Sequence, residues 1–365
     1  MMMMMMVILM LLMLLILIVN NTVNANNLPQ REAYPQILAH RGACGYVPEH
    51  SLQAYVLAMD MMTDYIEPDL CLSKDGIFVA LHDLLLDDVT NVASLDKFKN
   101  RKKTVVVEGT TMTGYFVNDF LYDELLELRL NQRLPYRTTL YNGKFQIPSL
   151  NQIMELAFNH FNNTNRLVGI YVELKHPSYF NQLGFNMADM LLESLHNGGY
   201  SINGAYNNMS NVVPCIIECF DADTLKYLHE KTDLPLIQLM NPPNTTNDKT
   251  NYWTDEKLKV ISEYASGVGP EKSFFVSQSL SSARDAVKRA HNYNLYIHPW
   301  TFREDNGIGT MFNGDFQKEL DYYYCCLSID ALFSEFPDVN REVIQRNQIL
   351  KKCTYDCNVE SYVVN

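Results

Sequence analysis

The sequence predicts an α/β fold, a (β/α)8 TIM-type barrel with an insertion after the third strand. Short apolar runs alternate with amphipathic stretches along most of the 365 residues, which is typical of repeated strand and helix units. Eight such runs favour a barrel over an open doubly wound sheet, and no Gly-rich dinucleotide-binding turn follows any of them. One connection, residues 83–146, is much longer than the others and is the predicted insertion.

The predicted strands are the eight apolar runs: Ile37–His40, Tyr65–Leu70, Phe78–His82, Val168–Leu174, Pro214–Phe220, Leu234–Leu239, Leu295–Pro299 and Ile329–Ser334. Helical periodicity follows several of them: Ser51–Met61, Leu150–Phe161, Asn186–Asn197, Asp223–Lys231, Thr254–Tyr264 and Ser279–Asn292. We therefore place the barrel within residues 32–346. Residues 347–365 form a polar tail that we expect to be peripheral.

The insertion carries a basic patch, Lys97, Lys99 and Arg101 to Lys103, within irregular polar sequence. Connections of this length inside a compact domain are usually functional or form a small subdomain. We expect a subdomain of residues 83–146 over the mouth of the barrel.

The first 25 residues have the features of a signal peptide. Met1 to Val19 carries no charge, and Val23-Asn24-Ala25 offers small residues where a signal peptidase cleaves. The usual basic n-region is missing, and 19 apolar residues could also span a bilayer, so an uncleaved signal anchor is the alternative. No later segment could span a membrane, so the mature chain has no span if cleavage occurs.

Sequons and cysteines also fit a secretory route. Three acceptor triplets begin at Asn162, Asn208 and Asn244, so we expect a secreted or lumenal glycoprotein, or a membrane-tethered one if the leader stays. The secretory context favours disulfides among the eight cysteines over thiolate metal sites. Cys215 and Cys219 would lie about 13 Å apart in one strand, too far to pair. Cys353 and Cys357 are better candidates for a small disulfide loop.

The charge of the chain limits its partners. A formal net charge of -13 disfavours binding to nucleic acid or to anionic membrane surfaces, because each needs a broad basic patch. A small anionic substrate would have to be bound by a few local cationic groups.

Five polar islands stand at the ends of predicted strands: His40-Arg41, Pro48-Glu49, Glu67-x-Asp69, His82-Asp83 and Glu173-x-Lys175. Residues two apart in a strand point to the same face, so each E-x-D or E-x-K pair presents two charged groups together. Glu67, Asp69 and Glu173 would make an oxygen-only site suited to Ca²⁺ or Mg²⁺ rather than zinc. Two imidazoles, an arginine and a lysine remain for a phosphate, which indicates phosphodiester hydrolysis.

Each island also has an ordinary explanation. A lone His at a strand end is usually a hydrogen-bonded structural residue, and E-x-D is usually a solvated strand face. The joint pattern favours His40 and His82 as an acid/base pair, because an imidazole gains or loses its proton near neutral pH. The direction of proton transfer is unassigned.

Two further positions have a functional and a structural interpretation. Glu49 either has a functional role, orienting Arg41 or contacting the metal shell, or caps the helix beginning at Ser51. Trp300 lies where barrel active sites are built and is expected to line the pocket rather than the core, whereas His298 suits either place equally.

Ordered motifs give these residues a family resemblance. AHRGACGYVPEHSLQAY, EPDLCLSKDGIFVALHD, IYVELKHP and HPWTFR resemble the glycerophosphodiester phosphodiesterase family. ECFDADTLK, EYASGVGPE and SEFPD resemble later segments of its periplasmic-type, calcium-using branch. The resemblance covers about Ile37 to Asp338.

The resemblance implies a barrel fold with an insertion after the third strand. It implies these site residues: His40, Arg41, Glu49, Glu67, Asp69, His82, Glu173, Lys175 and Trp300. The sequence departs from the family pattern at Asp88, where Arg is common, at Pro68 inside E-x-D, and at Ser334-Glu335, where Thr-Asp is more usual. Cys44 in the first loop has no expected role.

The implied activity is hydrolysis of glycerophosphocholine, glycerophosphoethanolamine and similar diesters to sn-glycerol 3-phosphate and an alcohol. The implied cofactor is Ca²⁺, with Mg²⁺ as the alternative. Two rival interpretations keep the barrel: a phospholipase of the sphingomyelinase D type, and a protein that binds phosphodiesters without turnover.

Overall fold

The computed structural model describes residues 35–200, 214–241, 253–350 and Cys357. The predicted signal segment, the sequons at Asn208 and Asn244, and most of the tail lie outside these residues. Among the residues described, no helix is both long and apolar enough to cross a membrane.

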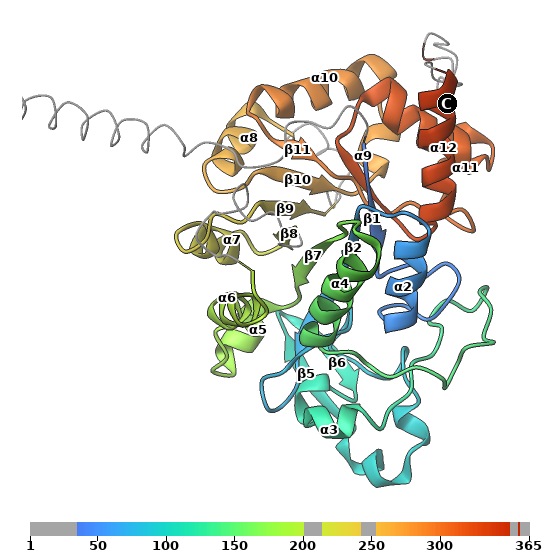
Figure 1. The fold of residues 1–365 in the computed structure, drawn as a ribbon. Coiled ribbons are helices and arrows are strands. Elements are labelled where there is room, and N and C mark those ends of the chain that lie inside the picture. Colours follow the sequence, from blue (N-terminus) through green and yellow to red (C-terminus); the bar gives the residue numbers. More distant parts are fainter. Residues whose placement is uncertain (1–34, 201–213, 242–252, 351–356, 358–365) are drawn as a thin grey trace, which may run out of the picture.

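Parallel strands form a nearly closed barrel (Figure 1). In chain order they are β1 (Gln36–His40), β2 (Tyr65–Glu67) with β3 (Asp69–Leu72), β7 (Gly169–Leu174), β8 (Cys215–Cys219), β9 (Leu236–Met240), β10 (Gly267–Pro270), β11 (Tyr296–Ile297) and β12 (Ala331–Ser334). β12 returns beside β1, and β11 and β12 are joined where Asp330 N donates to Ile297 O and Phe333 N to Pro299 O. The predicted barrel fold is confirmed.

Pro68 divides one barrel strand into β2 and β3. Both pieces pair with β7, through Ile66 with Ile170 and through Asp69 with Glu173. Proline has no N–H to donate to the ladder, so the pairing is interrupted at that residue and resumes after it.

Two strand predictions were wrong. The predicted strand Phe78–His82 is β4 (Phe78–Ala80), which pairs antiparallel with β3 and so is a hairpin arm rather than a barrel strand. The insertion follows β4, so the strand that we counted as the third one before the insertion is this hairpin arm. The barrel strand β10 was missed because Gly267, Gly269 and Pro270 are poor strand formers. A Cβ at Gly267 would lie 2.7 Å from Ile237 Cδ1 and 2.8 Å from Tyr296 O, so glycine allows β9 and β11 to approach.

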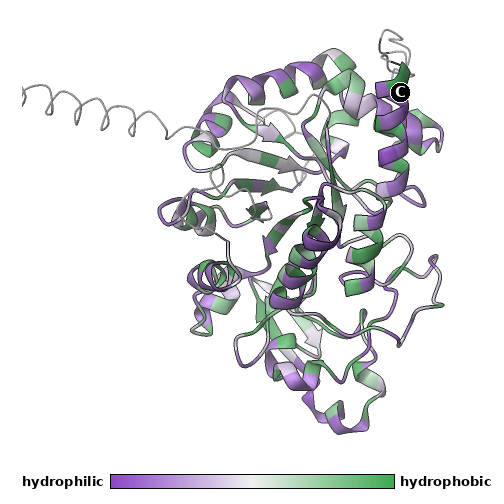
Figure 2. Cartoon of the chain, in the orientation of Figure 1, coloured by the Kyte–Doolittle hydropathy of each residue, from purple (hydrophilic) through white to green (hydrophobic). Residues whose placement is uncertain are grey.

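The main helices cover the outside of the barrel: α2 (Leu52–Asp60), α4 (Leu150–Thr164), α6 (Met187–Asn197), α7 (Ala222–His229), α8 (Asp255–Ser262), α10 (Leu280–Asn292) and α12 (Pro337–Leu350). Shorter helices are α5 (Pro177–Gln182), α9 (Ser273–Val276) and α11 (Phe316–Asp321). Each of the six predicted helices is present. Their N-caps, whose side chains accept backbone N–H groups, are Ser51, Ser149, Asn186, Asp221, Thr254 and Ser279. Figure 2 shows these helices with hydrophilic and hydrophobic residues intermixed, as expected for helices that pack one face on a sheet.

The insertion folds as a small unit beside the barrel (Figure 1). It contains the antiparallel ribbon of β5 (Lys103–Val107) and β6 (Thr110–Gly114), short 3-10 turns and α3 (Tyr122–Leu125). Phe98, Phe116 and Phe120 are buried inside it. Its basic residues pair with local acids: Lys97 with Glu127, Arg101 with Glu124, Lys102 with Asp87 and Lys103 with Asp119. The patch is therefore largely neutralised.

The described disulfide differs from the expected loop. Cys357 pairs with Cys326 rather than with Cys353. This disulfide joins the tail to the segment before β12. Cys215 and Cys219 are free buried thiols, as expected from their separation.

Candidate active site

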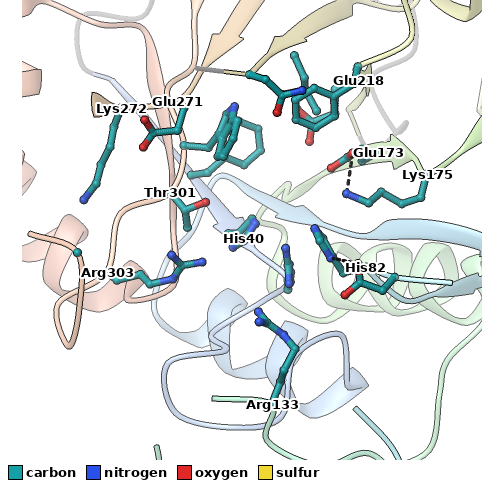
Figure 3. Close-up of a pocket in the computed structure, with 18 of the residues that line it drawn as sticks. His40, His82, Arg133, Glu173, Lys175, Glu218, Glu271, Lys272, Thr301 and Arg303 are labelled. Atoms are coloured by element: carbon teal, nitrogen blue, oxygen red, sulfur yellow. Dashed lines mark hydrogen bonds and ion pairs between the residues drawn. The ribbon is translucent and has the colours of Figure 1, made fainter. Parts of the chain in front are cut away.

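A cavity of about 640 Å³ lies at the carboxyl-terminal ends of the barrel strands. Predicted residues from β1, β7 and the loops after β4 and β11 line it, namely His40, Arg41, His82, Glu173, Lys175 and Trp300. Figure 3 shows His40, His82 and Lys175 converging on this space. In β/α barrels this end of the strands carries the active site.

The three predicted metal ligands come together at the side of the cavity. Ligand oxygens of Glu67, Asp69 and Glu173 all lie within 4.8 Å of one another, and all three residues are buried. Register explains this, because Asp69 on β3 stands opposite Glu173 on β7. The carboxylates are thus brought together by strand pairing.

The electrostatics of this cluster suit a bound cation. Burial and the neighbouring Asp69 raise the pKa of Glu67, and burial with Asp69 raises the pKa of Glu173 to about 8 despite Lys175. Asp69 Oδ1 is buried without a hydrogen-bond partner. Lys175 Nζ lies 2.9 Å from Glu173 Oε1 and 3.5 Å from Asp69 Oδ1. These oxygens could hold one divalent cation, whose charge would compensate the remaining repulsion.

Arg41 is fixed between two acids at the start of the first loop. Its backbone, at φ 60°, donates N–H to Glu67 Oε2 at 2.7 Å. Its Nη1 donates to Glu49 Oε1 at 3.0 Å, and Nε lies 3.1 Å from Asp69 Oδ2. Ser51, not Glu49, caps α2. Burial alone would raise the pKa of Glu49, but the charges of Arg41 and Arg133 outweigh burial and lower this pKa to about 2.

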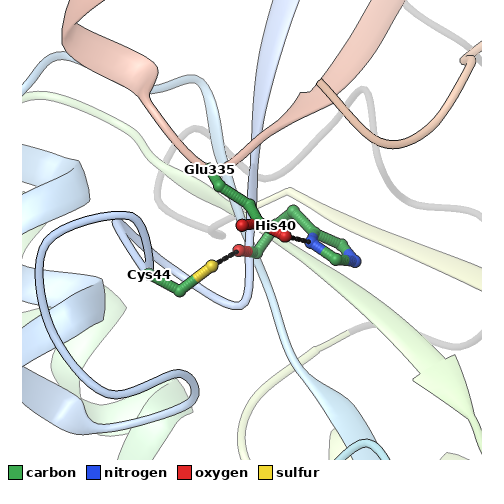
Figure 4. Close-up of side chains that lie close together, drawn as sticks. All are labelled: His40, Cys44 and Glu335. Atoms are coloured by element: carbon green, nitrogen blue, oxygen red, sulfur yellow. Dashed lines mark hydrogen bonds and ion pairs between the residues drawn. The ribbon is translucent and has the colours of Figure 1, made fainter. Parts of the chain in front are cut away.

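His40, at the end of β1, is oriented by Glu335. Its Nδ1 lies 3.1 Å from Glu335 Oε1 (Figure 4). Burial would raise the pKa of Glu335, yet His40, Arg303 and Arg137 hold it well below its usual range. An ionised acceptor fixes the proton of the imidazole on Nδ1, which leaves the lone pair on Nε2. Burial and Arg41 lower the pKa of His40 to about 3, so the ring is neutral at physiological pH.

Cys44 also belongs to this group of side chains. Its thiol donates to His40 O at 3.1 Å, and burial raises its pKa, so it stays protonated. Cys44, His40 and Glu335 are close enough to share a metal. Glu335 is already bound by Arg303 at 2.7 Å and Arg137 at 2.5 Å, so this group is a poor cation site.

The β3–β4 hairpin returns the chain to the cavity and delivers His82. Leu81 N donates to Asp69 O at 3.0 Å, which sets His82 next to the acidic cluster. His82 Nδ1 lies 3.0 Å from Asp83 Oδ1, and the side chain is 31% exposed. Desolvation, Arg41 and Lys175 lower the pKa of His82 to about 4. Burial would raise the pKa of Asp83, but His82 lowers it to about 2.

Aromatic residues form the opposite wall. The Trp300 indole donates to Gly269 O at 2.8 Å, and its ring meets Phe220 edge-on at 5.9 Å between centroids. His298 does not line this cavity. Its Nδ1 bonds Tyr171 Oη at 2.9 Å inside the barrel, where the residue is 2% exposed.

Several cavity or supporting residues were not predicted: His50, Arg133, Arg137, His176, Glu218, Arg303 and Glu335. Glu218 is buried on β8 in register with Glu173, and its Oε2 has no hydrogen-bond partner. His50 bonds Asp69 Oδ2 at 2.9 Å. Glu218, Glu335 and Arg303 end or follow predicted strands within recognised motifs, so their positions offered a signal. Arg133 and Arg137, inside the insertion, offered none.

Comparison with known proteins identifies the family. The model of the glycerophosphoryl diester phosphodiesterase family matches residues 40–339. The chain belongs to this family. Glycerophosphodiester phosphodiesterase GDPD6 of Arabidopsis thaliana is 36% identical over 328 residues, covering 86% of this chain and 87% of that protein. A glycerophosphodiester phosphodiesterase of Haemophilus influenzae is 28% identical and covers 85% and 89%.

Solved structures agree on the fold. A putative glycerophosphoryl diester phosphodiesterase from Silicibacter pomeroyi superposes with a TM-score of 0.64 at 17% identity, covering 87% of this chain and 95% of that one. An Oleispira antarctica phosphodiesterase in complex with sn-glycerol-3-phosphate gives 0.55 at 20% identity, covering 86% and 97%. The chain is therefore a phosphoric diester hydrolase on a TIM barrel. Membership of a family whose relatives are named as diesterases favours a hydrolase over a binding protein without turnover.

Proposed function

We propose that this hydrolase cleaves deacylated phospholipids such as glycerophosphocholine and glycerophosphoethanolamine into sn-glycerol 3-phosphate and an alcohol. One observation carries the proposal: three buried carboxylates with ligand oxygens within 4.8 Å of one another adjoin a cavity whose lining includes His40 and His82, each with an acidic partner at Nδ1. The sn-glycerol-3-phosphate held by the Oleispira antarctica neighbour has the chemistry of the proposed product.

Glu67, Asp69 and Glu173 would hold Ca²⁺, with Mg²⁺ as the alternative, since all three offer oxygen only. When bound, the ion supplies positive charge to polarise the phosphodiester. Arg41 and Lys175 add fixed cationic donors for phosphate oxygens, and Glu49 holds the guanidinium of Arg41 in place. Trp300 provides an apolar wall for the carbon atoms of the substrate.

The two histidines would divide the proton transfers. His40 Nε2 accepts the proton of the nucleophile, which is either water or a glycerol hydroxyl whose cyclic phosphate is then opened by water, and Glu335 stabilises the imidazolium that forms. Burial lowers the pKa of His82, and Arg41 and Lys175 lower it further; an anionic phosphodiester bound to these two cations would offset their share of the shift. His82 can then carry the proton that the departing alkoxide takes as the P–O bond breaks.

The test is release of glycerol 3-phosphate from glycerophosphocholine by the purified protein. Calcium should support release, and a chelator should abolish it until calcium is restored. The same assay with Mg²⁺ decides between the two ions. No release with any divalent cation would refute the proposal.

We also propose that the chain enters the secretory pathway and loses its leader near Ala25. The apolar leader, the Cys326–Cys357 disulfide and the exposed Asn162 at the end of α4 support this. N-terminal sequencing and glycosidase treatment of protein from its native source provide the test. An intact leader in a membrane fraction would instead favour the signal anchor.

A further inference from the structure

Two arginines of the insertion reach the carboxylates that hold His40 and Arg41. Arg133 and Arg137 lie in an irregular segment of the insertion. Its backbone is fixed where Asn131 N donates to Val89 O at 2.8 Å and Arg137 N to Leu134 O at 3.1 Å. The insertion thus presents two guanidinium groups to the barrel from an anchored support.

Arg137 is buried and joins three loops. Its side chain is 3% exposed, and Nε and Nη2 bond both oxygens of Asp305 at 2.6 and 2.9 Å. Nη1 donates to Cys44 O at 3.1 Å, and Nη2 lies 2.5 Å from Glu335 Oε2. Since Glu335 Oε1 meets His40 Nδ1, Arg137 holds one oxygen of the carboxylate whose other oxygen orients the imidazole.

Arg133 makes the equivalent contact with Glu49. Its Nε and Nη2 lie 3.2 and 3.1 Å from Glu49 Oε2, while Arg41 Nη1 donates to Oε1 at 3.0 Å. Glu49 is therefore shared between Arg41 and Arg133. Figure 3 shows the Arg133 side chain pointing into the cavity that it helps to line.

We propose that the insertion is part of the catalytic apparatus. Arg137 positions His40 through Glu335, and Arg133 positions Arg41 through Glu49. Both carboxylates are buried, and a buried carboxylate stays ionised and fixed only while cationic partners satisfy it. Loss of one arginine would let the carboxylate shift, and a displacement near 1 Å at a reacting group can cost about 100-fold in rate.

The experiment compares Arg137→Met and Arg133→Met with the matched control Arg101→Met. Arg101 also lies in the insertion and binds Glu124 through two N–H groups, but it does not line the cavity. With glycerophosphocholine and calcium, Arg137→Met should lower kcat about 10- to 100-fold with little change in KM. Arg133→Met should also raise KM, because Arg41 is a proposed phosphate ligand. Arg101→Met should keep the wild-type kcat.

Two further measurements separate positioning from a structural role. Arg137→Met combined with Glu335→Gln should lose little more activity than Glu335→Gln alone, because the arginine acts through that carboxylate. Guanidinium ion should partly restore kcat to Arg137→Ala. If Arg137→Met does not fold, Arg133→Met decides, since its side chain is 25% exposed.

The inference rests on the proposed function for its assay, and the two can fail separately. A wild-type protein that releases no glycerol 3-phosphate would refute the proposed function. An active wild type would overturn this inference alone if kcat stays unchanged in Arg133→Met and Arg137→Met, or if the double variant shows additive losses.

Discussion

Burial of His298 should make the stability of the protein depend on pH in a calculable way. Desolvation inside the barrel lowers the pKa of His298 from 6.5 to about 4. Between these two pKa values the unfolded chain binds a proton that the folded protein does not. The fold therefore keeps its full stability above about pH 6.5 and loses stability as the pH falls toward 4. At pH 5 the loss from this one group is about 2 kcal/mol relative to neutral pH, at 1.36 kcal/mol per pKa unit.

The assay is urea unfolding at pH 7.5 and pH 5.0 for wild type, His298→Gln and His229→Gln. The pKa values of His40 and His82 are lowered as well, so wild type loses stability at pH 5.0 through these groups too. The test is therefore the difference in that loss between wild type and each variant. His298→Gln should lose about 2 kcal/mol less than wild type between the two pH values. His229, exposed on α7, is the control and should behave as wild type. Equal losses in wild type and His298→Gln would show that His298 is not held neutral in the core.

Three other predictions concern the cation, the phosphate and the tail. Calcium at 100 times its Kd should stabilise the protein by about 2.7 kcal/mol, which a thermal melt would show as a rise in Tm of several degrees. Glu67→Gln should abolish this rise, and an equal rise in the variant would count against this site. Lys175→Met should lower kcat/KM for glycerophosphocholine about 100-fold, and a change below about threefold would remove Lys175 from phosphate binding. Replacing Cys326 and Cys357 together by Ser should cost about 4 kcal/mol, from the sequence separation of 31, with kcat unchanged; a lost kcat would link the tail to catalysis.

Strand patterns predicted much of the barrel because buried parallel strands are apolar runs of a few residues. β10 was missed because its sequence, Gly-Val-Gly-Pro, has low strand propensity. The glycines are required there by the close approach of the neighbouring strands. Phe78–His82 was taken for a barrel strand because an antiparallel hairpin arm buried at Phe78, Val79 and Ala80 has the same local pattern.

The site could be predicted where its residues end strands. Glu67, Asp69 and Glu173 are neighbours through strand register, which a barrel imposes once its strands are known. Arg133 and Arg137 could not be found in this way, because irregular insertion sequence carries no periodicity that reveals which barrel residue it contacts. Glu335 stood in a recognised motif after a predicted strand, but its contact with His40 depends on the closure of β12 against β1, which the sequence alone does not show.

The most direct test of the central claim measures calcium binding and turnover on the same two variants. Calorimetric titration with Ca²⁺ and release of glycerol 3-phosphate should separate the acidic cluster from the imidazoles. We predict that His82→Ala binds calcium with nearly wild-type affinity but releases no product, and that Glu67→Ala loses both. A His82→Ala variant with the wild-type rate, or a Glu67→Ala variant with unchanged calcium affinity, would contradict the account.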